Sequence, residues 1–284
     1  MLEILYSSLK ESIIIVGIIL VLMIIIEFLV LKYKEKIVVF TRKNKFTGYV
    51  VSSFFGIIPG CIGTFTMDTL YMSGLLGYGG IVAVMIATSG DEAFILISMA
   101  LKGEISWAIL IVLTLTLFIL GIIGGLFADY IKKKTNMQFS KKCLIVRHNA
   151  EEIKKGHFLK DHIYRHIIKK HIWQIFLWVF AAIFVISLLQ DNFNLQFTGT
   201  SMVYVLIIAC LVGILPISGP NVFLLVMFTK GLIPFSVLLA NSIIQDGHGL
   251  LPIMGFSMDD AVKIKLFNFA LGLFIGFILL SIGL

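Results

Sequence analysis

Apolar positions fall in long, nearly continuous blocks along this chain, separated by short polar stretches. The least interrupted blocks cover 12–31, 105–127, 172–189 and 261–284, and each is close to the ~20 residues that a membrane-crossing helix needs. Strands of a membrane barrel would instead be ~10-residue segments of alternating hydrophobicity. The pattern therefore predicts an all-α, polytopic membrane protein whose main partner is the lipid bilayer.

The two halves of the sequence align without gaps at one constant offset of 157 residues. Block 105–127 maps onto 262–284, and the aligned identities include four pairs: Gly56 and Gly213, Pro59 and Pro216, Gly74 and Gly231, Gly90 and Gly247. This indicates an internal duplication, with a first membrane repeat at 1–130, a linker loop at 131–171 and a second repeat at 172–284. Further apolar blocks, interrupted by Gly and Pro, bring each half to five segments, about ten transmembrane helices in all. The fourth segment of each half is broken, at Gly90 and Gly247.

Charge sets the expected orientation of these segments. The chain is 59% apolar and only 14% charged, and of its 23 Lys and Arg, six lie at 32–45 and twelve at 132–170. Basic loops face the cytoplasm, so the net charge of +7 does not indicate nucleic-acid binding, and the two termini are expected outside. The repeats are then inverted.

The first apolar block is too long for the core of a signal peptide and lacks a small-residue cleavage site. Eight crossings plus two re-entrant hairpins remain the alternative to ten crossings.

Polar residues inside the broken segments are the candidate binding site. Asp246 and His248 stand beside Gly247 and Gly249 within an apolar region, although a charge at mid-membrane depth costs about 2.5–3.5 kcal/mol on insertion scales. Inverted repeats with interrupted helices are typical of secondary transporters, and the carbonyl end of a half-helix suits a cation. The candidate metal-binding residues near the turns are Cys61, Ser89, Asp91, Glu92, Asn241, Gln245, Asp246 and His248.

This donor set indicates a divalent ion. Carboxylates, amide oxygens and one imidazole suit Mn²⁺, Fe²⁺, Co²⁺ or Zn²⁺, whereas Ca²⁺ favours an all-oxygen cage, and arsenic(III) would want several thiols. Some of these residues have alternative roles: Cys61 as a small residue beside a kink, Asn241 as an interhelical hydrogen-bonding group, Glu92 as a proton carrier. Asp68 is expected to be a helix cap or interfacial residue, and Lys263 and Lys265 to mark the cytoplasmic entry of the last segment.

The sequence contains no P-loop and no pattern of covalent or redox chemistry, so we expect a non-enzyme without cofactors, driven by an ion gradient. Proton exchange at Asp91, Glu92 or Asp246 is the hypothesis for coupling.

Four histidines of the linker loop recur at spacings of four and five residues: His157, His162, His166 and His171. They suit either a metal-sensing patch or a solvated basic face near anionic lipid.

Four motifs resemble a bacterial family of ten-helix heavy-metal exporters, whose members are labelled manganese transporters or arsenic efflux proteins. They are Gly56-Ile-Ile-Pro-Gly-Cys-Ile-Gly-Thr-Phe65, Met85-Ile-Ala-Thr-Ser-Gly-Asp-Glu-Ala93, Ile233-Pro-Phe-Ser-Val-Leu-Leu-Ala-Asn-Ser242 and Gln245-Asp-Gly-His-Gly249. The resemblance implies export across the plasma membrane. With the donor set, it predicts a secondary active exporter of a divalent transition metal, with Mn²⁺ favoured. The alternatives are an arsenite or organoarsenical permease that depends on Cys61, and a channel-like pore or sensor that uses the histidine-rich loop.

Overall fold

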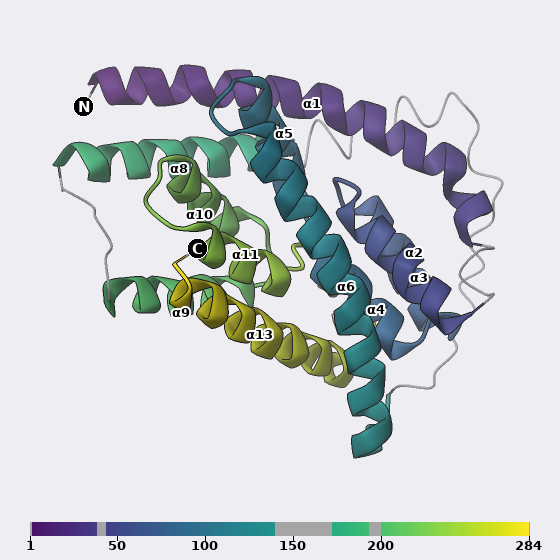
Figure 1. The fold of residues 1–284 in the computed structure, drawn as a ribbon. Coiled ribbons are helices and arrows are strands. Elements are labelled where there is room, and N and C mark those ends of the chain that lie inside the picture. Colours follow the sequence, from purple (N-terminus) through teal and green to yellow (C-terminus); the bar gives the residue numbers. More distant parts are fainter. Residues whose placement is uncertain (1, 39–43, 140–171, 193–199, 284) are drawn as a thin grey trace.

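The computed structural model describes residues 2–38, 44–139, 172–192 and 200–283, and the regular elements of these ranges are all α-helices (Figure 1). The histidine-rich part of the linker lies outside them. The first half contains α1 (Leu2–Val38), α2 (Lys45–Ile57), α3 (Ile62–Met72), α4 (Tyr78–Ala87), α5 (Glu92–Leu101) and α6 (Trp107–Thr135). The second half contains α8 (Trp173–Asn192), α9 (Thr200–Gly213), α10 (Gly219–Thr229), α11 (Phe235–Ile244), α12 (Leu250–Phe256) and α13 (Met258–Ser281). The prediction of an all-α fold is confirmed.

The local geometry of the chain repeats at the offset of 157 residues. Both ends of α3 map onto the ends of α10, and both ends of α4 map onto the ends of α11. Two glycine pairs at this offset share left-handed backbone angles: Gly74 and Gly231 have φ of 74° and 71°, and Gly90 and Gly247 have φ of 47° and 52°. Glycine adopts this conformation without the steric cost that a Cβ brings, so these positions fix where the helices of both halves end.

Helices α2 and α3 fold back on each other as an antiparallel hairpin. Ser52 Oγ lies 3.7 Å from Met67 Sδ, and a Cβ built on Gly63 would lie 2.2 Å from the carbonyl oxygen of Phe55. The 11 residues of α3 span about 16 Å at 1.5 Å per residue, which is about half of a ~30 Å hydrocarbon core. Helices α9 and α10 are the corresponding pair in the second half.

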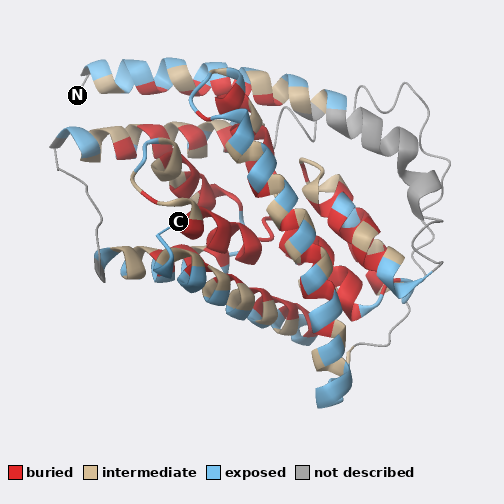
Figure 2. Ribbon diagram, viewed as in Figure 1, coloured by how far each residue is buried: buried red, intermediate tan, exposed pale blue. Residues whose placement is uncertain are grey.

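Helices α4 and α5 follow one another across a break at 88–91, and α11 and α12 do so across a break at 245–249. Counting each broken pair as one segment, the twelve helices of the described ranges form ten segments, and the fourth of each half is broken as predicted. Every residue of α4 is buried. Nine of the ten residues of α11 are also buried. Helices α4 and α11 therefore lie at the centre of the molecule, among the red ribbons of Figure 2.

The long helices surround this centre. Four segments of the described chain have the length and hydropathy of membrane spans, in α1, α4–α5, α6 and α13. Exposed apolar side chains recur along α6 at a spacing of four, at Ile111, Leu115, Ile119 and Ile123, which places one face of this helix toward lipid. On its other face, a Cβ on Gly121 would lie 2.8 Å from the carbonyl oxygen of Ala83, and a Cβ on Gly272 of α13 would lie 2.8 Å from that of Ala240. Glycines thus bring a long helix against the broken helix in both halves.

Candidate metal centre

The two helix breaks meet inside the protein. Gln245 Nε2 donates a hydrogen bond of 3.3 Å to the carbonyl oxygen of Thr88, and these two residues occupy equivalent positions at the offset of 157. Thr88 Oγ1 in turn lies 2.6 Å from Thr64 Oγ1 of α3. Thr88 and Gln245 are both buried. The bond between them joins the two repeats, and the Thr64–Thr88 contact ties the first break to α3.

Three of the predicted residues form a cluster at this meeting point. Ligand atoms of Cys61, Asp91 and His248 all lie within 4.8 Å of one another, and Cys61 Sγ lies 4.0 Å from Asp91 Oδ1. Cys61 comes from the turn of the α2–α3 hairpin, Asp91 from the start of α5, and His248 from the break before α12. Thiolate, carboxylate and imidazole are all ligands of divalent transition metals. We call these three residues the metal cluster.

Backbone geometry positions two members of the metal cluster. Asp91 follows Gly90 directly and His248 follows Gly247 directly, and both glycines are in the left-handed region. Asp91 and His248 are themselves equivalent at the offset of 157. The same turn in each half therefore presents a candidate ligand, an acid in one half and an imidazole in the other.

Ser218 completes this pseudo-symmetric arrangement. It is the equivalent of Cys61, and it lines a small cavity of about 20 Å³ with Asp91, Glu92 and His248. Its Oγ is buried and has no hydrogen-bond partner among the described residues. The apolar walls of the cavity include Trp178 of α8. A volume of this size holds about one water molecule, which is also the scale of one ion with few waters. Sequence analysis did not select Ser218 as a ligand, although the offset to Cys61 was a signal that could have found it.

Glu92 lies at the same cavity but outside the metal cluster. Its side chain interacts electrostatically with Asn221 of α10, and its Oε1 is buried without a hydrogen-bond partner among the described residues. Asn241 Nδ2 donates to Asn221 Oδ1 at 3.0 Å and to the carbonyl oxygen of Ala209 at 2.9 Å. Asn241 thus makes the interhelical hydrogen bonds that were its alternative role, and these bonds hold Asn221 beside Glu92.

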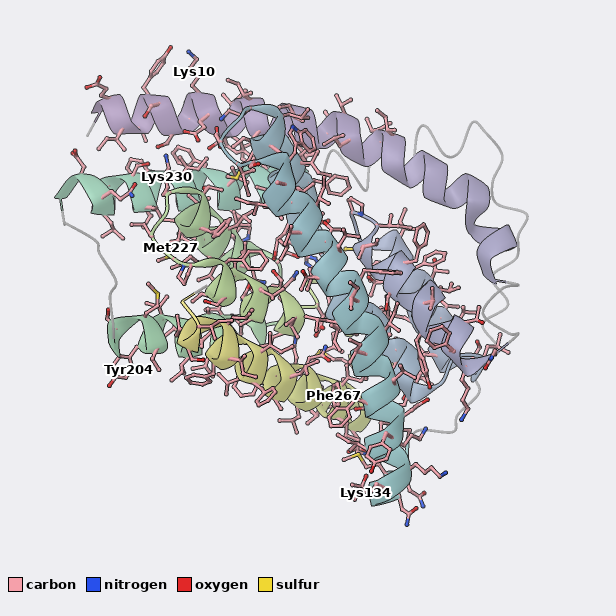
Figure 3. All side chains as sticks on the ribbon, viewed as in Figure 1. Lys10, Lys134, Tyr204, Met227, Lys230 and Phe267 are labelled. Atoms are coloured by element: carbon pink, nitrogen blue, oxygen red, sulfur yellow. The ribbon has the colours of Figure 1, made fainter. Side chains whose placement is uncertain are left out.

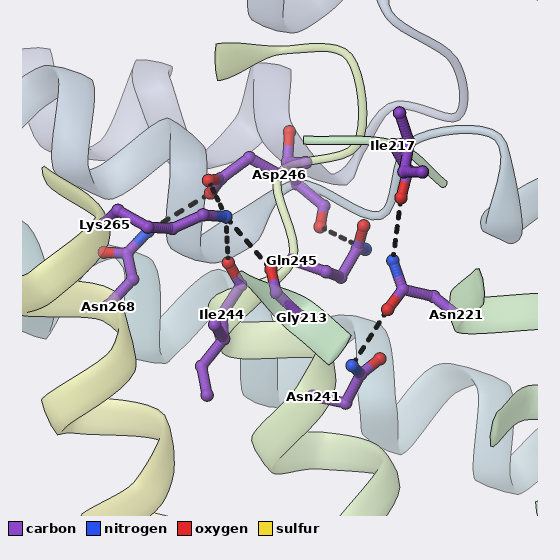
Figure 4. Close-up of polar contacts among 10 residues, drawn as sticks. Gly213, Ile217, Asn221, Asn241, Ile244, Gln245, Asp246, Lys265 and Asn268 are labelled. Carbon is purple, nitrogen blue, oxygen red and sulfur yellow. Dashed lines mark hydrogen bonds and ion pairs between the residues drawn. The ribbon is translucent and has the colours of Figure 1, made fainter. Parts of the chain in front are cut away.

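Asp246 makes a different set of contacts. Its Oδ2 forms an ion pair with Lys265 of α13, and its Oδ1 accepts a hydrogen bond of 3.3 Å from Asn268 Nδ2, as Figure 4 shows. It does not belong to the metal cluster. Ser89 lies in the first break, where its backbone N–H donates to the carbonyl oxygen of Gly56 at 3.4 Å. Gln245 has its Oε1 buried without a hydrogen-bond partner in the described chain.

Two sequence-based expectations are wrong. Lys265 does not mark an interfacial entry: it is only 7% exposed, and its ammonium contacts Asp246. Asp68 is not a cap or interfacial residue, because it lies within α3 and is fully buried. Both errors have one cause: a position near the end of an apolar block predicts a place near the membrane surface, whereas short helices place these residues inside the protein.

Comparison with known proteins agrees with this architecture. The chain matches the family described as "Putative, 10TM heavy-metal exporter" over residues 1–202 and 177–282. It belongs to this family of ten-helix membrane proteins, and it is a multi-pass membrane protein. No curated protein and no solved structure matches the chain.

Proposed function

We propose that this protein is a secondary active exporter that moves a divalent transition metal across the bacterial plasma membrane, with the metal cluster as its binding site. The observation that carries the proposal is the convergence of Cys61, Asp91 and His248 from three separate elements where the two broken helices meet. Discontinuous helices in each of two repeats are the usual frame for a transporter site near the membrane midplane. The family supports export as the direction of transport.

We further propose that the two repeats are inverted in the membrane. The open end of the α2–α3 hairpin shares a cavity of about 1040 Å³ with the C-terminal end of α6, including Lys45, Gly74 and Lys132. The end of α10 shares a cavity of about 400 Å³ with the segment that precedes α6, including Lys230 and Lys102. Because α6 is about 43 Å long, the two hairpins open toward opposite sides. Figure 3 shows Lys134 at one end of the molecule, away from Lys10 and Lys230.

The basic end of α6 gives the direction of this arrangement. Lys132, Lys133 and Lys134 occupy its last turn, and basic segments remain on the cytoplasmic side. The α2–α3 hairpin then enters from the cytoplasm and the α9–α10 hairpin from outside. The ten segments agree with the ten transmembrane helices of the family, and in this arrangement both chain ends lie outside.

The donor set refines the choice of metal. Mn²⁺ is favoured when the ligands are mostly oxygen, but a thiolate and an imidazole together suit Zn²⁺ or Co²⁺ better. With Cys61 in the cluster, we place these borderline ions ahead of Mn²⁺. Arsenic(III) fits less well, because Cys61 is the only thiol of the cluster and Cys210 is buried within α9.

Coupling to protons is the proposed driving force. Metal binding displaces protons from thiol, imidazole and carboxylate groups, so loading the cluster would release protons and unloading it would take them up. Glu92 supports this scheme, because its carboxylate lines the same cavity without belonging to the cluster. It is positioned to exchange a proton with a group that binds the metal.

The decisive experiment is transport by the purified full-length protein in liposomes that contain a metal-sensitive dye. Zn²⁺, Co²⁺, Mn²⁺ and arsenite would each be supplied with and without a pH gradient. We expect uptake of at least one divalent ion, accelerated by the gradient and abolished in Asp91→Asn. Asp259→Asn, at an exposed carboxylate on α13, is the matched control. Transport of arsenite alone would favour the permease alternative, and divalent transport without pH dependence would remove proton coupling.

A further inference from the structure

A buried lysine ammonium lies among three oxygen atoms at the second helix break. The ammonium of Lys265 donates hydrogen bonds to the carbonyl oxygens of Ile244 at 2.8 Å and Gly213 at 3.0 Å. Its third partner is Asp246 Oδ2. Figure 4 shows these three oxygens around one nitrogen.

The two carbonyls are the ends of helices. Gly213 is the last residue of α9 and Ile244 is the last residue of α11. The final carbonyls of a helix have no partner within it and carry the negative end of its dipole. Two helix ends and one carboxylate therefore face a single point, and this arrangement needs a positive charge.

The carboxylate that pairs with the ammonium has a second polar neighbour. Asn268 Nδ2 donates to Asp246 Oδ1 at 3.3 Å, while its own Oδ1 is buried without a hydrogen-bond partner among the described residues. An amide oxygen without a partner therefore lies on the side chain that contacts Asp246.

The first half shows what the same fold does without the lysine. At the offset of 157, Gly213 corresponds to Gly56, Asp246 to Ser89, and Lys265 to Ala108. There the carbonyl oxygen of Gly56 accepts a hydrogen bond from the backbone N–H of Ser89 instead. The carboxylate and the cation therefore occur together in one half and are both missing from the other.

We propose that Asp246, Gly213, Ile244 and Asn268 form a monovalent cation site, in which the Lys265 ammonium replaces a free alkali ion of the size of Na⁺. All the donors are oxygens, which is the chemistry of hard cations. The free ion would carry a charge of +1, because the ammonium whose place it takes carries one positive charge. This site is separate from the metal cluster, and it requires no assumption about which metal the protein transports.

The test is to remove the built-in cation and offer a free one. Lys265→Ala would be purified in detergent and equilibrated with NaCl, KCl or choline chloride at one ionic strength. Thermal unfolding and equilibrium binding of ²²Na⁺ would be measured. We expect saturable ²²Na⁺ binding and a Na⁺-specific rise in Tm of about 5 °C at 100-fold excess over Kd. Wild type should show neither.

Two further variants keep the result interpretable. Lys263→Ala removes a half-buried lysine two positions away, paired with Asp259, and should respond to the three salts as wild type does. Lys265→Ala/Asp246→Asn removes cation and carboxylate together and should lose the Na⁺ response. The proposal is overturned if Lys265→Ala shows no difference between salts, or if the Na⁺ response survives in the double variant. It is also overturned if only the double variant folds in NaCl, since the oxygens would then be unable to accept a free ion. None of these outcomes bears on metal export.

Discussion

The two helix breaks have the same backbone and different chemistry. At 88–92, a glycine with positive φ is followed by Asp91 and Glu92, which face the cavity of the metal cluster. At 245–249, the equivalent glycine is preceded by Asp246, which forms an ion pair with Lys265, and followed by His248, a member of the metal cluster. The two breaks therefore share one backbone geometry but differ in their side chains: each contributes one residue to the metal cluster, Asp91 or His248, and only the second break also holds an ion pair. Such a site has one strongly anionic side, which suits a single cation.

The largest expected effect comes from the ligands themselves. Asp91→Asn keeps the size of the side chain but removes the anionic oxygen. We expect the rate of metal transport to fall by at least about 100-fold. This loss is larger than the roughly 10–100-fold loss seen when a residue that only supports a ligand is mutated. Initial rates in liposomes would measure this. Asn241→Ala, which removes only interhelical hydrogen bonds, should reduce the transport rate less. Equal losses in the two variants would mean that Asp91 acts through the fold.

The ion pair at the second break should dominate stability. Lys265→Met leaves Asp246 as an uncompensated buried charge, which typically costs about 3–5 kcal/mol. Adding Asp246→Asn should recover most of this loss, because both charges are then gone. Unfolding by SDS in mixed micelles would measure both variants. If the double variant is no more stable than Lys265→Met, the lysine stabilises the protein through packing and not through charge.

A matched pair of glycine variants compares the two breaks directly. Alanine at either position adopts the left-handed region at a cost of about 1–2 kcal/mol. A Cβ at Gly90 meets no atom within 4 Å, whereas one at Gly247 would lie 2.7 Å from Ser218 Oγ. Gly247→Ala should therefore be the more destabilising variant, and adding Ser218→Ala should reduce the difference. Identical unfolding curves for the two single variants would contradict this geometry.

The sequence predicted the membrane fold well because long apolar blocks and repeated glycines are local signals. The offset of 157 residues located both breaks, and Gly90 and Gly247 have the expected role. It predicted the site only in part. Asp91 and His248 are found at the breaks, but their proximity to Cys61 depends on how the α2–α3 hairpin folds back, which no local pattern reports.

The misplaced residues share a physical reason. Lys265 and Asp246 are 19 positions apart, and nothing in the linear pattern shows that α13 passes the end of α11. A lysine beside an apolar block normally extends toward the interface, so its burial could be inferred only from the carboxylate that pairs with it. Asp68 is a similar case. Its distance from the membrane surface depends on the length of α3, which the apolar pattern does not show.

The smallest expected effect is on the selectivity between metal ions. It can be tested at the remaining pair of residues that are equivalent in the two halves. Cys61 and Ser218 occupy equivalent turns, so Cys61→Ser makes the two turns alike and leaves oxygen where a thiol was. We expect transport of Zn²⁺ to fall by about 10-fold relative to Mn²⁺, because thiolates select the softer ion. Ser218→Cys should shift the ratio the other way. Competition between the two ions in liposomes would measure both changes. An unchanged ratio in Cys61→Ser would show that the thiol is a small packing residue beside the kink and would return Mn²⁺ to first place.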